Sequence, residues 1–88
     1  MTTILSETDV AGLTAAKVVD ARGAACPGPL LEAKKAMGTI AVGNLLELWS
    51  TDAQTKVDVQ AWAGKVGHEF LGHLSADGYE RVFVRRAK

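Results

Sequence analysis

The sequence predicts an α+β fold, a two-layer sandwich of helices on a sheet with the element order βαβαββ. Its 88 residues are enough for one domain with one modest core. Strand-like and helix-like hydrophobic periods alternate along the chain, which indicates helical crossovers between strands. Such crossovers pair strands in parallel, whereas a short final turn gives an antiparallel hairpin. We therefore expect two helices packed on one face of a mixed four-stranded sheet.

Residues 1–16 have no sustained hydrophobic period, so we expect a loosely ordered leader or a short edge strand there. The remaining residues, 17–88, are expected to form the single domain. Its first strand is predicted over 17–21, a β-branched segment that ends at Arg22-Gly23.

The first helix is predicted over residues 27–40. The residues that recur at helical spacing are Leu30, Ala33, Met37 and Ile40. Pro27 suits a first turn, because the N–H that proline lacks has no partner within the helix there. Gly38 and Gly43 mark the end of the helix.

The second strand is predicted over residues 45–50. Leu46 and Leu48 alternate with Glu47 and Trp49, which is the pattern of a strand with one face in the core and the other face in water. The sequence therefore predicts a half-buried strand.

The second helix is predicted to begin after Thr51-Asp52, which supply an N-cap, and to stop near Gly64 and Gly67. Its apolar stripe is Thr55, Val59, Trp62 and Val66. Two strands follow, over 68–74 and 79–85. The Asp77-Gly78 pair between them favours a tight hairpin turn.

The composition bounds the function. Lysine plus arginine and aspartate plus glutamate each number 10, so the formal net charge is zero and nothing favours a nucleic-acid backbone as partner. No apolar run reaches the roughly 20 residues that span a bilayer, and the N-terminus does not resemble a secretory signal. We expect a cytoplasmic protein that contacts neither nucleic acid nor membrane.

Cys26 is the one cysteine, and it directly precedes the first predicted helix. Unpaired N–H groups at a helix N-terminus favour the thiolate, which is the reactive form of cysteine. The alternative is a small buried core residue, which is a common place for a free cysteine. Pro27 and Pro29 on one side, and the small residues Ala24 and Ala25 on the other, favour a reactive, accessible thiol.

Several chemistries need partners that this sequence does not supply. A dithiol oxidoreductase needs a second cysteine where Pro29 stands, and a metal site needs more ligands than His68 and His73 can add. Those histidines are five residues apart in a predicted strand, so we expect them to face opposite sides. No histidine is evidently placed as a base for hydrolysis, and His68 is more typical of a structural residue. A group carrier needs only an activated, exposed nucleophile.

Five separated segments carry a family resemblance. They are Asp20 and Gly23 before Cys26-Pro27-Gly28-Pro29, the Lys34-Lys35 helix, Gly43, Thr51-Asp52 and Gly67-His68. Over residues 18–86 the chain resembles the TusA family of sulfur carriers, also called SirA-like proteins. The most specific feature of this resemblance is the Cys-Pro-x-Pro motif at a strand-to-helix junction. Ala25 departs from the pattern, since many members have a larger residue there.

The resemblance implies a sulfur carrier that accepts sulfane sulfur as a persulfide on Cys26, with no other cofactor and no metal. The residues expected to support its turn are Asp20, Gly23, Pro27, Gly28, Pro29 and Asp52. The implied donor is a cysteine desulfurase or a rhodanese, and the implied acceptor is a DsrE-type sulfurtransferase. The sequence leaves open whether the sulfur serves tRNA thiolation, molybdenum cofactor formation or sulfur oxidation.

Partner recognition has fewer signals. Arg22, Lys34 and Lys35 could steer acidic partner surfaces, or could be ordinary solvated charges. Trp49 and Trp62 could form a docking surface, although their spacing favours the core. We expect a monomer. The alternative functions are a noncatalytic regulatory or protein-interaction module and a thiol redox sensor.

Overall fold

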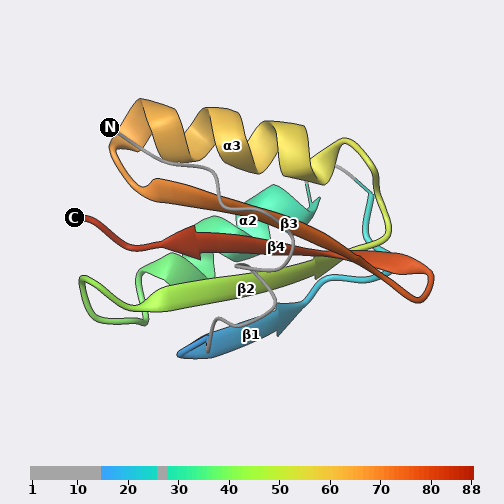
Figure 1. Cartoon of the computed structure of the whole chain (residues 1–88), viewed down its shortest axis with the longest axis horizontal. Coiled ribbons are helices and arrows are strands. Elements are labelled where there is room, and N and C mark those ends of the chain that lie inside the picture. Colours follow the sequence, from blue (N-terminus) through green and yellow to red (C-terminus); the bar gives the residue numbers. More distant parts are fainter. Residues whose placement is uncertain (1–14, 26–27) are drawn as a thin grey trace.

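The computed structural model describes residues 15–25 and 28–88 (Figure 1). Predictions about residues 1–14, Cys26 and Pro27 lie outside the described residues. The elements, in chain order, are β1 (Lys17–Asp20), α2 (Gly28–Met37), β2 (Leu45–Ser50), α3 (Thr55–Val66), β3 (Glu69–Ala76) and β4 (Tyr79–Arg85). The predicted α+β architecture and its order of elements are confirmed.

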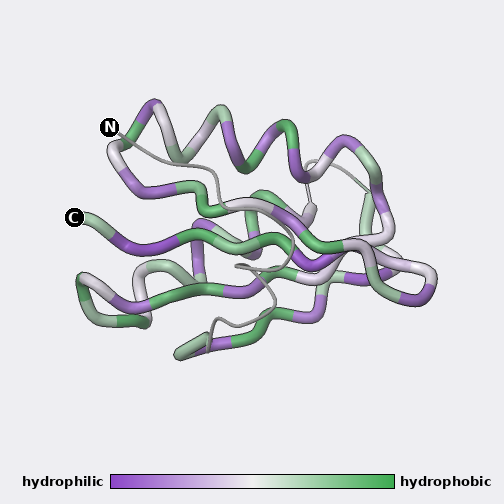
Figure 2. The backbone as a smooth tube through the Cα atoms, in the orientation of Figure 1, coloured by the Kyte–Doolittle hydropathy of each residue, from purple (hydrophilic) through white to green (hydrophobic). Residues whose placement is uncertain are grey.

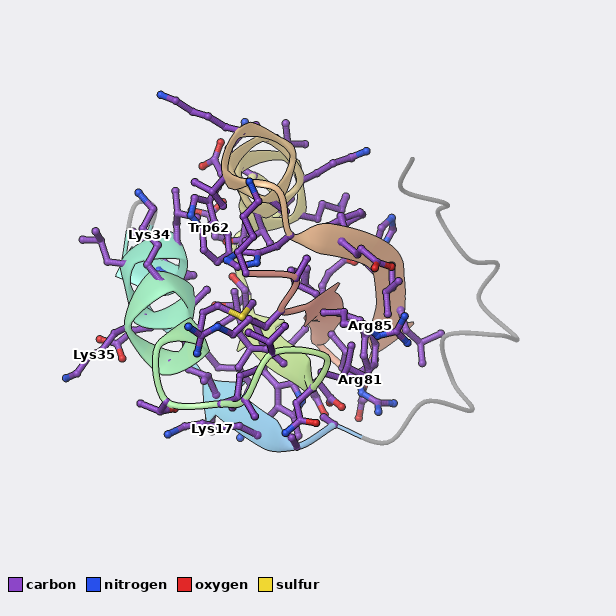
Figure 3. All side chains as sticks on the ribbon, turned by 90° about the vertical axis from the view of Figure 1, so that its left-hand side faces the viewer. Lys17, Lys34, Lys35, Trp62, Arg81 and Arg85 are labelled. Carbon is purple, nitrogen blue, oxygen red and sulfur yellow. The ribbon has the colours of Figure 1, made fainter. Side chains whose placement is uncertain are left out.

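The sheet has the strand order β1-β2-β4-β3. β1 and β2 are parallel, as expected for strands joined through α2, while β4 is antiparallel to both β2 and β3. Figure 3 shows α2 and α3 on the same side of the sheet. The predicted hairpin is also confirmed, since Ala76 pairs with Tyr79 and Gly78 has a φ of 81° in the turn.

The main core lies between the helices and the sheet. Its fully or nearly fully buried side chains come from α2, α3 and the three longest strands, and include Ala33, Met37, Val59, Ala63, Leu46, Leu48, Val82 and Val84. Figure 2 shows hydrophobic and hydrophilic residues alternating along α3, as expected of a helix with one buried face. On α3 the predicted stripe was partly wrong: Val66 is 39% exposed, and Ala63 takes a fully buried place instead.

The opposite face of the sheet is also partly buried, so the prediction of a half-buried β2 was wrong. Glu47, expected in water, is only 5% exposed, and Leu45 on the same face belongs to a second apolar cluster with Leu71 and Phe83. β2 is an inner strand, flanked by β1 and β4. Its two faces are covered by the two apolar clusters, one containing Leu46 and Leu48 and the other Leu45.

Several predicted boundaries also differ. α2 ends at Met37, although Ile40 is buried beyond it, because the hydroxyl and N–H of Thr39 both donate to the carbonyl of Ala36 and close the last turn. His68 precedes β3 instead of starting it. A β-bulge between Phe70 and Gly72 then shifts the register of the strand.

Candidate functional site

The candidate site lies where β1 and β2 end. Because the two strands are parallel, their carboxyl ends meet at the same edge of the sheet. The loop over residues 21–25 follows β1 and leads toward α2, and the loop over residues 51–54 follows β2 and leads to α3. Cys26 belongs to the first connection by sequence.

The loop after β1 is fixed to its neighbours by hydrogen bonds. The N–H of Ala21 donates to the carbonyl of Trp49 at 2.9 Å, which continues the β1–β2 pairing by one residue. The N–H of Ala24 then donates to the carbonyl of Ala21, and Gly23 within this turn has a φ of 87°. A residue with a side chain would be strained at that φ, so glycine suits this place.

Gly23 also connects the two loops, because its N–H donates to the hydroxyl of Thr51 at 2.9 Å. Sequence reasoning singled out Thr51 only as a helix cap and missed this contact. No local pattern could have revealed it, since the two residues are 28 positions apart.

Asp52 does not cap α3 as predicted. The residue at the N-cap position is Gln54, which has a helical backbone and makes no side-chain capping bond. Instead, one carboxylate oxygen of Asp52 accepts the N–H of Gln54, and the hydroxyl of Ser50 accepts the N–H of Asp52. The Asp52 side chain therefore stabilises the turn between β2 and α3, and not the first turn of the helix.

Asp20 and Arg22 form a two-pronged ion pair at the start of the first loop. The guanidinium Nε and Nη2 atoms of Arg22 lie 2.9 and 2.8 Å from the two carboxylate oxygens of Asp20. These bonds, together with one from the backbone N–H of Arg22, hold the pKa of Asp20 below its ordinary value. The charge of Arg22 is thus already paired.

The same guanidinium lies over an aromatic platform on the face of the sheet opposite the helices. Its central carbon is 4.9 Å from the ring centroids of both Trp49 and Tyr79. Cation–π contact and the ion pair together hold the Arg22 side chain against the sheet. The structure therefore gives Trp49 a contact with this loop, beyond its place in β2.

At the start of α2, the N–H of Gly28 donates to the carbonyl of Ala25 at 2.8 Å. Pro29 is fully buried, whereas Ala25 is exposed. A Cβ on Gly28 would lie 3.3 Å from that of Ala24, so the chain passes closely over itself here. Ala25 and Gly28, which flank Cys26 and Pro27 in the sequence, are thus hydrogen-bonded to each other.

The structure does not bring Lys34 and Lys35 to these loops. Both are exposed in the second half of α2, and they point to different surroundings. Lys34 lines a groove together with Trp62, whereas Lys35 lines a separate depression with Lys17 and Glu32.

The two histidines do not face opposite sides, which corrects the prediction made from their spacing. His68 packs edge-on against Trp62 of α3, and His73 contacts Glu80, which also pairs with Lys56 of α3. The bulge in β3 and the position of His68 outside that strand break the simple alternation. Within residues 15–25 and 28–88, no three His, Cys, Asp or Glu side chains cluster as a metal site would require.

No helix in the described part of the chain is long and apolar enough to cross a membrane.

Comparison with known proteins identifies the family. The family model described as Sulfurtransferase TusA matches residues 17–86. A protein of Archaeoglobus fulgidus named "Putative sulfur carrier protein" is 39% identical over 81% of this chain and 97% of its own length. The "Sulfur carrier protein TusA" of Pseudomonas entomophila is 31% identical over 77% of this chain and 85% of its own length.

A solved structure agrees at the level of the fold. The SirA-like protein of Desulfitobacterium hafniense superimposes with a TM-score of 0.71 at 23% identity, over 82% of this chain and 99% of that one. Together with the family match, this confirms the resemblance drawn from the separated motif residues: the chain belongs to the TusA family, whose members are also described as SirA-like.

Proposed function

We propose that the protein is a sulfur carrier that takes up sulfane sulfur as a persulfide on Cys26 and passes it to an acceptor protein. The observation that carries this proposal is the position of the one cysteine, between exposed Ala25 and the first residue of α2, in a chain that belongs to the TusA family. Relatives named as sulfur carriers support the same role.

The proposed chemistry is an exchange of one sulfur atom between thiols. The Cys26 thiolate attacks the terminal sulfur of a donor persulfide, an S–S bond forms to Cys26, and the donor thiolate leaves as its own S–S bond breaks. An acceptor thiolate later attacks the terminal sulfur of the Cys26 persulfide and releases the Cys26 thiolate. Each step breaks one S–S bond and forms another, so the transfer needs no outside oxidant or reductant.

The surrounding residues would keep the thiol accessible and its loop in place. Pro29 is anchored in the core, and Thr51 holds Gly23 in the preceding turn. Leu31, one turn into α2, is 57% exposed and would give a partner an apolar contact next to the sulfur. In this arrangement Asp20 and Asp52 would hold the two loops through their bonds to Arg22 and Gln54.

The partners we propose are a cysteine desulfurase or a rhodanese as donor and a DsrE-type sulfurtransferase as acceptor. The sulfur would serve tRNA thiolation or dissimilatory sulfur oxidation. Both routes use the same thiol chemistry, so a single test of the carrier step applies to either.

The test is to incubate the wild type and Cys26→Ser with a polysulfide donor, or with a cysteine desulfurase and cysteine, and to weigh the intact proteins. The wild type should gain the mass of one sulfur atom, and dithiothreitol should remove it. An equal gain on Cys26→Ser, or none on the wild type, would contradict the proposal. Stable sulfenic acid in place of persulfide would indicate a redox sensor.

A further inference from the structure

An open groove of about 430 Å³ lies at the end of the molecule where α2 and α3 both finish. Its apolar floor is formed by Met37 of α2 and by Trp62 and Val66 of α3. The first residue of α2, Gly28, lies at the other end of that helix, ~14 Å away for ten residues at 1.5 Å per residue. The groove is therefore separate from the loops that flank Cys26.

The rim of the groove is basic. Four cationic side chains line it: Lys34, Lys65, Arg86 and Lys88. Among the residues that the structure describes, no Asp or Glu side chain lines this groove or forms an ion pair with any of the four, and Nε of Arg86 donates to the main-chain oxygen of Lys88 at 2.7 Å. Figure 3 looks at this end of the molecule and shows Lys34 and Trp62 on the two helices that flank it.

Six cationic side chains lie elsewhere, and of these Lys17 and Lys35 have no ion pair among the described residues. Four others each form an ion pair with a carboxylate: Arg22 with Asp20, Lys56 with Glu80, Arg81 with Glu47 and Arg85 with Glu69. Within the described residues, four of the six cations that have no carboxylate side chain as an ion-pair partner thus lie at one groove of a chain with zero net charge. Such a concentration attracts a negatively charged partner.

The groove is also held in shape by the C-terminal residues. The guanidinium of Arg86 donates to the backbone carbonyl of Ile40, just beyond α2. The N–H of Ala87 donates to Nδ1 of His68 at 3.1 Å, and the side chain of Lys88 lies across Gly67, 2.9 Å from where a Cβ would stand. These contacts therefore hold the C-terminal residues of the rim against the ends of both helices.

We propose that this groove binds an acidic segment of a partner protein, one that places an apolar side chain on Trp62 between carboxylates that meet the basic rim. The apolar floor favours a peptide over a phosphate backbone, because a nucleic acid would leave Met37 and Val66 uncovered by apolar groups. Binding needs no thiol, so it does not depend on sulfur transfer. A partner held here would leave the start of α2 open.

The experiment is a titration of ¹⁵N-labelled protein with a capped octapeptide of glutamate and aspartate that contains one leucine and one phenylalanine. The indole N–H signal of Trp62 should shift, while that of Trp49, whose indole bonds to Glu47 on the opposite face of the sheet, should stay in place. Trp62→Phe assigns the two signals. Cys26→Ser should bind equally well, which separates this test from that of the carrier function.

Lys34 and Lys35 supply a matched pair of variants, because they are adjacent on α2 and only Lys34 lines the groove. Lys34→Glu should weaken binding about fivefold and Lys35→Glu by less than about twofold, from the usual strength of exposed charge pairs. Equal losses in the two variants, or equal binding of the peptide with its acids replaced by glutamine and asparagine, would overturn the proposal. Tighter binding of a single-stranded oligonucleotide at Trp62 would overturn it in favour of nucleic acid.

Discussion

The hydroxyl of Thr51 accepts the N–H of Gly23 at 2.9 Å and so joins the loop after β1 to the loop after β2. Replacing Thr51 with valine keeps the shape of the side chain and removes this acceptor. We expect slower alkylation of Cys26 by iodoacetamide at neutral pH, by about threefold, because a looser loop weakens stabilisation of the thiolate by the helix start. The free energy of unfolding should fall by only about 1 kcal/mol.

Thr39→Val is the control for that experiment. The hydroxyl of Thr39 also makes a hydrogen bond near α2, but it donates to the carbonyl of Ala36 at the opposite end of the helix. It should leave the alkylation rate of Cys26 unchanged. Equal rates for wild type and Thr51→Val would show that this contact does not influence the thiol.

Glu47→Ala should be strongly destabilising. Glu47 is buried on the face of the sheet opposite the helices, where it accepts hydrogen bonds from Arg81 and from the indole of Trp49. Removing it leaves a partly buried guanidinium and an indole N–H without their acceptor, which costs about 3 kcal/mol. Urea denaturation followed by circular dichroism measures the loss.

The matched variant is Glu69→Ala. Glu69 pairs with Arg85 at 3.5 Å, and both side chains are about two-fifths exposed. Its loss should therefore cost less than about 0.5 kcal/mol. A similar loss in the free energy of unfolding of both variants would mean that the burial of Glu47 does not increase its contribution to stability.

Gly67 and Gly64 should respond to alanine in opposite directions. Gly67 ends α3 with a φ of 91°, and an added Cβ would meet the side chain of Lys88, so Gly67→Ala should cost about 1–2 kcal/mol. Gly64 lies inside α3 with open space around it, so Gly64→Ala should stabilise the protein by about 0.5–1 kcal/mol. Thermal unfolding of both variants tests this, and a destabilised Gly64→Ala would refute it.

Stability should decrease as the pH falls below about 7 because of His68. Burial, with the nearby charges of Arg86 and Lys88, lowers the pKa of His68, and its Nδ1 atom accepts the N–H of Ala87. The unfolded chain therefore takes up a proton at a higher pH than the folded one. The contribution of His68 is complete above its unfolded pKa of about 6.5 and is lost as the pH falls toward the folded pKa.

The measurement is the melting temperature of the wild type and of His68→Asn across that pH range. The variant should be less stable at pH 7.5, with a smaller decrease on acidification. Identical pH profiles would show that His68 does not carry the effect. His73, which contacts Glu80 at 3.0 Å, provides the comparison variant His73→Asn.

The sequence predicted most closely the elements whose local pattern and burial agree. β2 over 45–50 and β4 over 79–85 have the predicted bounds, and the turn at Asp77-Gly78 lies where its glycine requires it. Both helices pack on one side of the sheet, as expected when α2 joins β1 to β2 and α3 joins β2 to β3.

What could not be predicted depends on contacts between distant segments. Glu47 is buried because Arg81, 34 residues away, neutralises it, and Thr51 accepts a bond from Gly23. On α3 the buried side chain is that of Ala63, whereas Val66 is exposed. This difference likewise depends on how the helix packs on the sheet. Periodicity reports which residues are apolar, but not which polar residues find partners.

The bulge in β3 has a consequence for how the protein behaves at high concentration. β3 is an edge strand of eight residues, long enough to template the addition of a strand from another molecule. The irregularity between Phe70 and Gly72 interrupts its row of outward N–H and C=O groups, and the other edge, β1, has only four residues. In the sheet formed by residues 17–85, neither edge offers a long uninterrupted ladder, which protects the protein against aggregation through strand pairing while its surface stays available to successive partners.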